Sequence, residues 1–171
     1  ELHVSIGGRQ IFGSPWQVTM EPGLIDQQRT SVKGAGLSSG RCGAHCKFTI
    51  EARDVYSNGR SLGGDVFVVQ CNTDRASVVA NITDNMDGTY TTAYTPTVAG
   101  TYDILIMNNG AKVAECPYKA IITAADAFPL NCIPVGQGVN SGVAGEDTIF
   151  TIEARDRFSN TCRGGGSVFD V

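Results

Sequence analysis

Apolar and polar residues alternate along this chain with a period of two. The alternation is clearest in four segments, which are residues 48–53, 67–71, 90–94 and 102–106. A period of two places one set of side chains on a buried face of a β-strand and the other set in water. No stretch has the sustained apolar spacing of a helix. The pattern therefore predicts strands throughout.

Glycine and asparagine concentrate between these segments, at residues 57–59, 84–88 and 108–110. Both residue types accept the positive φ angles that tight hairpins require. About seven short strands in roughly 100 residues, separated by such turns, are typical of an antiparallel β-sandwich of immunoglobulin type. The fold class predicted is therefore all-β.

The chain repeats itself at a spacing of 102 residues. Segment Phe48–Asn58 returns almost unchanged as Phe150–Asn160, and the same offset relates Pro15 to Pro117. A period near 100 residues is too long for a solenoid unit and matches one small domain. The sequence therefore predicts tandem immunoglobulin-like sandwiches.

The phase of the repeat divides the chain into three parts. Residues 1–20 are predicted to be the end of a preceding repeat, residues 21–122 a complete repeat, and residues 123–171 the first part of a following repeat. A partial domain cannot bury its own core. We therefore expect the sequence to be a window onto a longer protein.

Composition narrows the classes of function. The formal net charge is -4 and Lys and Arg form no cluster, which argues against a nucleic-acid partner. The longest apolar stretch, around Ala120–Ala125, is far shorter than the roughly 20 residues of a membrane-spanning helix. We expect no membrane span in this segment.

Candidate catalytic residues are few. The two histidines, His3 and His45, have no counterparts one period away, and nothing places them beside a nucleophile. Asp84 and Asp87 could suggest a calcium loop, but the spacing that ends in a bidentate Glu is missing. Asp87-Gly88 is better interpreted as a hairpin turn. We predict no catalytic, metal or cofactor site, and no enzyme.

The order of several motifs resembles the filamin-type repeat. These motifs are Gly13–Trp16, Gly34–Leu37, Phe48–Ile50 with Arg53-Asp54, Gly63–Asp65, Asp84–Tyr90, Tyr94–Pro96 and Gly100–Tyr102. The resemblance covers the complete unit and both partial ones. It implies a seven-stranded sandwich of two sheets, used in series as a spacer and docking module. It also suggests that Tyr102 is buried, with its hydroxyl bonded to nearby backbone.

Six cysteines are more than a cytosolic sandwich of this size needs. In the topology that the resemblance implies, three pairs would be neighbours and could form disulfides: Cys132 with Cys162, Cys46 with Cys71, and Cys42 with Cys116. The counterparts of Cys132 and Cys162 are Thr30 and Arg60, so both members of that pair are absent together from the complete unit. The alternative is six reduced thiols, because free cysteine packs as a small hydrophobic residue.

Two features indicate where the protein works. Disulfides require an oxidising compartment, and Asn81-Ile82-Thr83 is an acceptor sequence for an N-glycan, although such tripeptides also arise by chance. Filamin-like repeats occur in surface proteins of algae and protists and in gamete-adhesion proteins of plants. The prediction is therefore an extracellular or cell-surface protein. The alternative is the cytoplasmic cytoskeleton, where the actin-crosslinking filamins lie.

Two functions remain from different classes. The first is a structural spacer in a filament, stalk or adhesion protein, whose partners are other protein chains or copies of itself, with short linkers that limit bending. The second is a docking module that binds an extended peptide by β-augmentation, between residues 65–71 and about 78–82. Its candidate docking strand contains Asp65, Val66, Val68 and Gln70. A neighbouring domain or a glycan could instead cover these valines.

Overall fold

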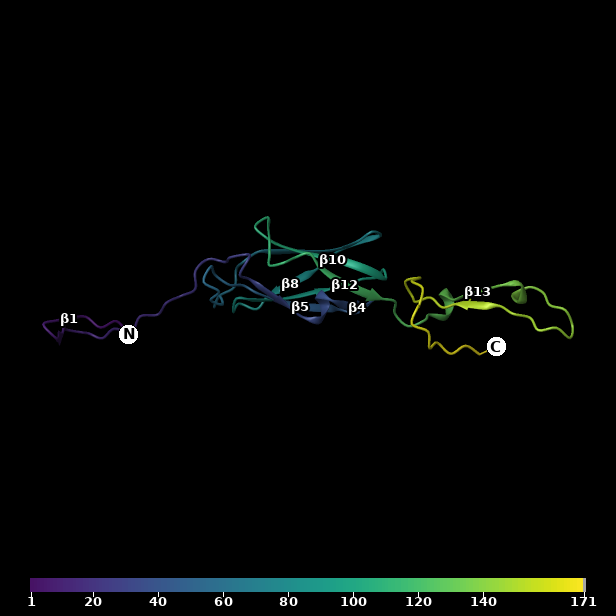
Figure 1. Cartoon of the computed structure of the whole chain (residues 1–171), viewed down its shortest axis with the longest axis horizontal. Coiled ribbons are helices and arrows are strands. Elements are labelled where there is room, and N and C mark those ends of the chain that lie inside the picture. Colours follow the sequence, from purple (N-terminus) through teal and green to yellow (C-terminus); the bar gives the residue numbers. More distant parts are fainter. Residues whose placement is uncertain (171) are drawn as a thin grey trace.

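The computed structural model describes residues 1–170 and forms three parts along the chain. A β-sandwich occupies the centre, a hairpin of β1 (Ser5–Ile6) and β2 (Arg9–Gln10) precedes it, and a strand pair of β13 (Ile133–Val135) and β14 (Thr151–Glu153) follows it (Figure 1). Residue 171, the last of the third predicted part, lies outside the described residues.

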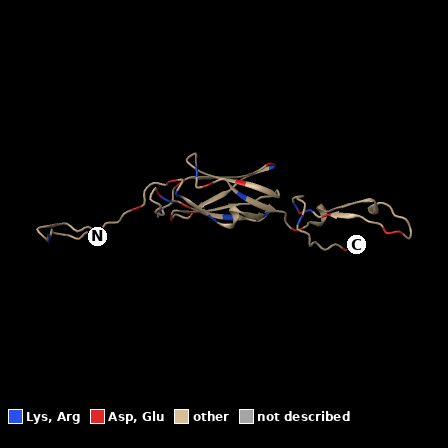
Figure 2. Ribbon diagram, in the orientation of Figure 1, with Lys and Arg blue, Asp and Glu red and all other residues tan. Residues whose placement is uncertain are grey.

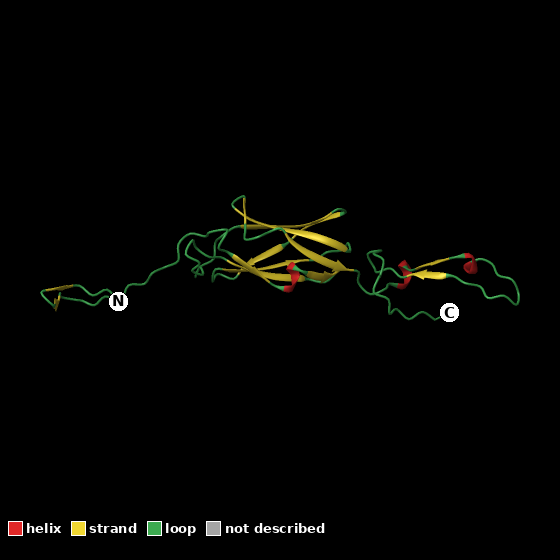
Figure 3. Cartoon of the chain, in the orientation of Figure 1, coloured by secondary structure: helices red, strands yellow, loops and turns green. Residues whose placement is uncertain are grey.

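Strands occur in every part, as predicted. The helical elements of residues 1–170 are three short 3-10 turns, η1 (Ala35–Leu37), η2 (Pro129–Asn131) and η3 (Gln137–Val139) (Figure 3). None of the described helices is long or apolar enough to cross a membrane. Basic and acidic residues are interspersed along the molecule (Figure 2). The all-β prediction is confirmed.

Two sheets form the sandwich. The four-stranded sheet has the order β3 (Ser31–Lys33), β5 (Cys46–Glu51), β9 (Thr89–Tyr94) and β8 (Asn81–Asp84). The six-stranded sheet has the order β4 (Ser39–Arg41), β12 (Tyr118–Thr123), β10 (Gly100–Asn108), β6 (Phe67–Thr73) and β7 (Ala76–Val79), and β11 (Ala111–Lys112) pairs with β10. All pairs are antiparallel except β12 with β4, which is parallel.

The core lies between the two sheets and follows the predicted alternation. Phe48 and Ile50 of β5 face Val69 of β6 and Ile104 of β10, and each is at most 2% exposed. Removing one such side chain from water contributes about 1.5 to 3 kcal/mol to folding. The ring of Phe67 also packs edge to face on Tyr90, with centroids 4.7 Å apart.

Tyrosine hydroxyls join loops to this core. Tyr102 is fully buried and its hydroxyl donates to the Val98 carbonyl at 3.0 Å, so its predicted burial and bond to nearby backbone are confirmed. The Tyr94 hydroxyl donates to the Gly36 carbonyl at 2.7 Å and anchors η1. Paired hydroxyls matter because a buried polar group without a partner is costly.

The turn between β8 and β9 is the hairpin predicted at Asp87-Gly88. Its carboxylates accept backbone N–H groups, from Met86 to Asp84 Oδ1 at 2.8 Å and from Thr89 to Asp87 Oδ1 at 2.9 Å. Residues 1–170 contain no group of three or more His, Cys, Asp or Glu side chains arranged to hold a metal ion. The acidic residues of this turn therefore have a structural explanation.

Residues 124–170, which we term the C-terminal segment, reproduce the beginning of the sandwich. Ile133 pairs with Glu153 just as Ser31 pairs with Glu51, at the same offset of 102 residues. Apolar side chains such as Ile149 remain 81% exposed in this segment. A strand pair of this size lacks the second sheet that would cover those side chains.

Candidate interaction surfaces

Val66 and Val68 project from the outer face of the six-stranded sheet, as their sequence parity predicts. They are 68% and 44% exposed. Met107 lies opposite Val68 on β10, and Val79 lies opposite Gln70 on β7. We call Val66, Val68, Val79 and Met107 the apolar patch. Such a face suits contact with another protein surface.

The edge of β6 beside the apolar patch is closed by β7. The pairing runs from Gln70 with Val79 to Thr73 with Ala76, and the Ala80 N–H donates to the Val69 carbonyl at 3.1 Å. Only two residues separate β6 from β7, and so short a connection makes the two strands pair as a hairpin. The predicted docking groove between residues 65–71 and 78–82 is therefore wrong from Val69 onward, and Gln70 is not on an open edge.

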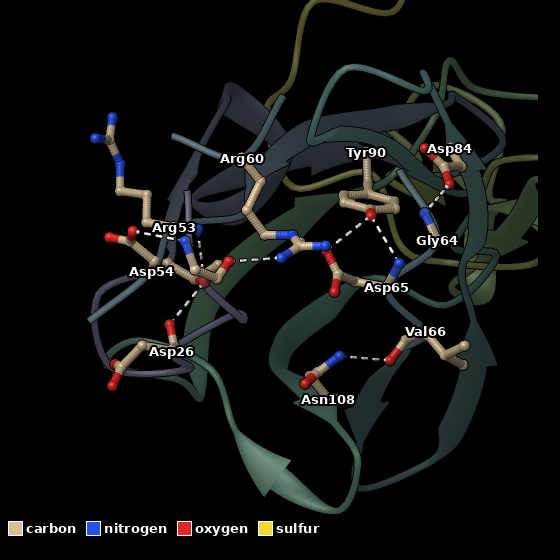
Figure 4. Close-up of polar contacts among 12 residues, drawn as sticks. Asp26, Arg53, Asp54, Arg60, Gly64, Asp65, Val66, Asp84, Tyr90 and Asn108 are labelled. Carbon is tan, nitrogen blue, oxygen red and sulfur yellow. Dashed lines mark hydrogen bonds and ion pairs between the residues drawn. The ribbon is translucent and has the colours of Figure 1, made fainter. Parts of the chain in front are cut away.

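Asp65 also differs from its predicted docking role. Its carboxylate lies 2.9 Å from Arg60 Nε and accepts the Tyr90 hydroxyl at 3.0 Å, while its backbone N–H donates to the same hydroxyl oxygen (Figure 4). Arg60 Nη1 donates to the Gly23 carbonyl at 2.7 Å. Burial and the Asp65 carboxylate raise the pKa of Tyr90 to about 12, which keeps its hydroxyl a donor. Asp65 is thus a structural residue.

Asn108 is a further buried polar residue that the sequence analysis did not identify. It is 1% exposed, its Nδ2 donates to the Val66 carbonyl at 2.9 Å, and its Oδ1 accepts from Gln27 Nε2 at 3.0 Å (Figure 4). These bonds fix the start of β6 beneath the apolar patch. A single asparagine in a turn-like Asn-Asn-Gly sequence offers no signal of this role.

All six cysteines are free thiols in the structure, whereas three disulfides were expected. The pair Cys42 and Cys116 is wrong. The Cys42 N–H bonds to Thr123 at the end of β12, whereas Cys116 precedes the start of that strand and its Sγ lies 3.2 Å from the Ile106 carbonyl. Six or seven extended residues separate the two by roughly 20 Å. A disulfide requires Cα atoms within about 7 Å of each other.

The other two pairs lie in shared environments. Cys46 and Cys71 are both buried in the core, and burial, with the nearby Cys46, raises the pKa of Cys71 to about 12. Cys132 and Cys162 are half-buried in the C-terminal segment, where Cys132 Sγ lies 3.4 Å from the Phe128 carbonyl. Burial raises the pKa of Cys162, with smaller contributions from charged neighbours and Cys132. Disulfide formation in these two pairs stays a prediction.

Asn81 begins β8, the edge strand of the four-stranded sheet, and its side chain is exposed. Thr83, the third residue of the acceptor sequence, is exposed as well. The position is open to a modifying enzyme and has space for a glycan. Glycosylation itself stays a prediction.

A densely hydrogen-bonded polar site, which is not among the predicted sites, is built around Asp54. This carboxylate is only 2% exposed and accepts four hydrogen bonds. The donors are the backbone amides of Gly23, Tyr56 and Asn58, all at 2.9 Å, and the Asn58 side chain at 3.0 Å. The Asn58 side chain and the Gly23 amide lower the pKa of Asp54 to about 2. The site ties the linker at Gly23 to the loop after β5.

The same site recurs around Asp156 in the C-terminal segment. Its carboxylate is fully buried and accepts from the backbone amides of Ala125, Phe158 and Asn160, all at 2.9 Å, and from Asn160 Nδ2. Burial alone raises the pKa of Asp156, but the bonds from Asn160 and Ala125 outweigh it and the pKa is lowered. We call these two sites the aspartate clamps. Their sequence signal is the repeated Arg-Asp-x-x-Ser-Asn motif.

The histidines belong to neither site. His45 Nδ1 lies 2.9 Å from Thr95 Oγ1, and His3 lies beside Glu1 and Gln10 in the N-terminal hairpin. The structure brings neither histidine to a nucleophile or to an aspartate clamp. The polar geometry of residues 1–170 is that of loops fixed to a scaffold.

The architecture and these loop sites define a repeat of the immunoglobulin-like sandwich class. The family model described as the Filamin/ABP280 repeat matches residues 24–119, more than half of the chain. The chain belongs to the filamin repeat family. The filamin repeat is a structural and binding domain that mediates contacts between proteins, not an enzyme.

One curated relative and two solved structures are similar to this chain. Filamin-C of Mus musculus is 29% identical over 136 residues, which are 80% of this chain and 5% of that protein. The Lin-41 filamin domain is 18% identical with a TM-score of 0.52 and covers 57% of this chain and 95% of its own. The Escherichia coli adhesin FdeC is 18% identical with a TM-score of 0.65 over 86% of this chain and 46% of its own. The two structural likenesses concern the fold.

Proposed function

We propose that this chain is part of a non-enzymatic spacer of tandem filamin repeats, in an extracellular or cell-surface filament, stalk or adhesion protein. The observation that carries the proposal is the second aspartate clamp. Asp156 and the pair β13 and β14 reproduce Asp54 and the pair β3 and β5 with the same hydrogen bonds and register. Residues 123–171 then begin another repeat, and residues 1–20 end an earlier one.

The clamps also support a spacer because they limit bending between repeats. Each carboxylate holds a residue of the linker, Gly23 or Ala125, against the loop of the repeat that follows. A linker fixed by a buried, charged hydrogen bond cannot act as a free hinge. In an array of repeats joined in this way, the orientation of one repeat constrains the orientation of the next.

The location is proposed from surface chemistry. Asn81 is an exposed acceptor on an edge strand, and Cys132 and Cys162 are half-buried within one segment. Both features suit the secretory pathway, where N-glycans are added and thiols are oxidised.

Expression of the chain with a secretion signal in cultured eukaryotic cells tests the location. We expect glycopeptide mapping to find a glycan on Asn81 and non-reducing peptide mapping to find a Cys132–Cys162 disulfide. The variant Thr83→Ala removes the acceptor sequence while retaining Asn81, and its secreted form should lack the glycan. An unmodified Asn81 together with six free thiols would instead place the protein in the cytoplasmic cytoskeleton.

A second candidate function is docking of an extended peptide on the apolar patch, which the exposure of Val66 and Val68 favours. Peptides selected from a displayed library against the full chain provide the probe. We expect Val68→Glu to weaken their binding at least tenfold, because a carboxylate would lose its water on contact with an apolar ligand. Lys47→Glu, on the outer face of the other sheet, should leave binding unchanged. If the peptides bind Val68→Glu as tightly as they bind the parent, the apolar patch is excluded as their binding site.

A further inference from the structure

The side chain of Asn160 joins the C-terminal segment to the end of the sandwich. Its Nδ2 donates to the Thr97 carbonyl at 2.9 Å and its Oδ1 accepts from the Ala99 N–H at 2.9 Å. The same Nδ2 donates inward to Asp156. A carboxamide has two N–H donors and an acceptor oxygen, and the Asn160 carboxamide bonds both to the sandwich and to Asp156 of its own segment. The clamp therefore orients Asn160 toward the sandwich.

An aromatic ring and an ion pair complete this contact. Phe158 lies so close to Gly43 that a Cβ on that glycine would be 2.9 Å from the ring. Arg41 forms an ion pair with Asp126 and donates through Nε to the Ala124 carbonyl at 3.2 Å. We call this contact the joint. The Phe158 ring packs on the sandwich backbone, and the polar bonds of Asn160 and Arg41 flank it. Together these contacts hold the C-terminal segment and the sandwich in one orientation.

The sandwich contains the equivalent loop, Val55–Asn58, but no other part of the described chain covers the outer side of this loop. Asn58 makes the inner bonds to Asp54, but its Oδ1 accepts no hydrogen bond within residues 1–170. Tyr56 is 81% exposed, whereas its counterpart Phe158 is 36% exposed. Val55, beside it, is 56% exposed. The loop is therefore preorganised like the one at the joint, without the surface that covers it.

We propose that Val55–Asn58 is a docking surface for the trailing end of another filamin repeat. In this chain that end is formed by Cys42-Gly43 and Thr97–Ala99. The Thr97 carbonyl and the Ala99 N–H together bind both ends of one carboxamide side chain. Beside them, Gly43 has no side chain and leaves room for an aromatic ring. The proposal rests on the tandem arrangement proposed above and names the partner of each repeat. An asparagine in each loop then fixes the angle between successive repeats.

Hydrogen exchange of the Ala99 amide tests the joint in the full chain. Asn160→Ala removes its acceptor, and we expect Ala99 to exchange about tenfold faster while the amides of β5 and β10 keep their rates. Asn58→Ala is the matched control. It removes the corresponding side-chain bond to Asp54 and keeps the backbone bond, and Ala99 should keep its rate. If Asn160→Ala leaves the exchange rate of the Ala99 amide unchanged, the proposed role of Asn160 at the joint is overturned.

A tandem chain tests the docking surface itself. All buried apolar residues of the sandwich lie between Cys42 and Ile122, so residues 21–122 contain a complete core. Joining residues 21–122 directly to residues 21–171 keeps the period of 102 and presents a trailing end to the second copy of Val55–Asn58. With the first copy labelled with 15N by segmental ligation, its Ala99 amide should be protected. Asn58→Ala in the second copy should speed its exchange about tenfold.

Two negative results have different meanings. If both copies fold but Ala99 of the first copy exchanges freely whether or not Asn58 is present, the docking surface is overturned and the tandem function stands. If residues 21–122 fail to fold as a unit in the tandem chain, the tandem function fails and the docking surface fails with it. The circular dichroism spectrum and unfolding curve of the tandem chain separate the two results.

Discussion

Replacing Gly88 with alanine is expected to destabilise the sandwich by about 3 to 5 kcal/mol. Gly88 has a φ of +81°, and a Cβ at this position would lie 2.0 Å from the Arg60 carbonyl oxygen. The Arg60 backbone is itself held by the bond from its N–H to the Ala52 carbonyl at 2.9 Å. The Gly88 carbonyl also accepts the Ala52 N–H at 2.9 Å, so the turn cannot move away without losing that bond. Urea unfolding followed by circular dichroism measures the change.

Gly110 provides the matched control for Gly88→Ala. It has the same φ of +81°, but nothing lies within 4 Å of a Cβ built there. Gly110→Ala should therefore cost only the backbone strain, about 1 to 2 kcal/mol. Equal losses in the two variants would show that strain alone, and not the contact with Arg60, makes Gly88 necessary.

Asp54→Asn is expected to lower the melting temperature strongly at pH 7 and progressively less in acid. The pKa of Asp54 is about 2 in the folded protein, below the value of about 3.9 for an unfolded aspartate. A lowered pKa stabilises the fold fully above the unfolded value, and this contribution disappears as the pH falls from about 4 to about 2. An asparagine cannot accept all four bonds, since its Nδ2 is a donor.

Thermal unfolding of both proteins between pH 2 and pH 7 measures the effect of Asp54. The difference in melting temperature should be largest above pH 5 and close most rapidly below pH 4. Asp74→Asn, at the exposed turn between β6 and β7, should track the parent at every pH. A difference between Asp54→Asn and the parent that is constant over the whole range would refute a role for the ionised carboxylate.

Several features of the fold follow from residues close together in the chain. The alternation of Phe48, Ile50 and Ala52 specifies which face of β5 is buried, because side chains of a strand point to opposite faces in turn. Asp87-Gly88 specifies a reversal, because glycine accepts the left-handed backbone that the turn requires. Such signals need no knowledge of distant partners.

The candidate sites were harder to predict because they join distant segments. Gln70 is not on an open edge because β7 pairs with β6 at this position. Cys42 and Cys116 lie near opposite ends of β12. The residues that matter most at the joint, Asn160 and Ala99, are 61 positions apart. Nothing in either local sequence indicates that one carboxamide would satisfy the other residue's amide.

The sequence by itself determined the strand pattern, the turns, the 102-residue repeat and membership of the filamin repeat family. These properties depend on local spacing and on comparison of one part of the chain with another. Only the tertiary structure decided which strand edge is covered, that Cys42 and Cys116 lie too far apart to pair, and that Asp54 and Asp156 hold linkers to loops. The reason is that hydrogen bonds and burial depend on where distant segments meet, and that place is set by the packing of two sheets rather than by any short stretch of residues.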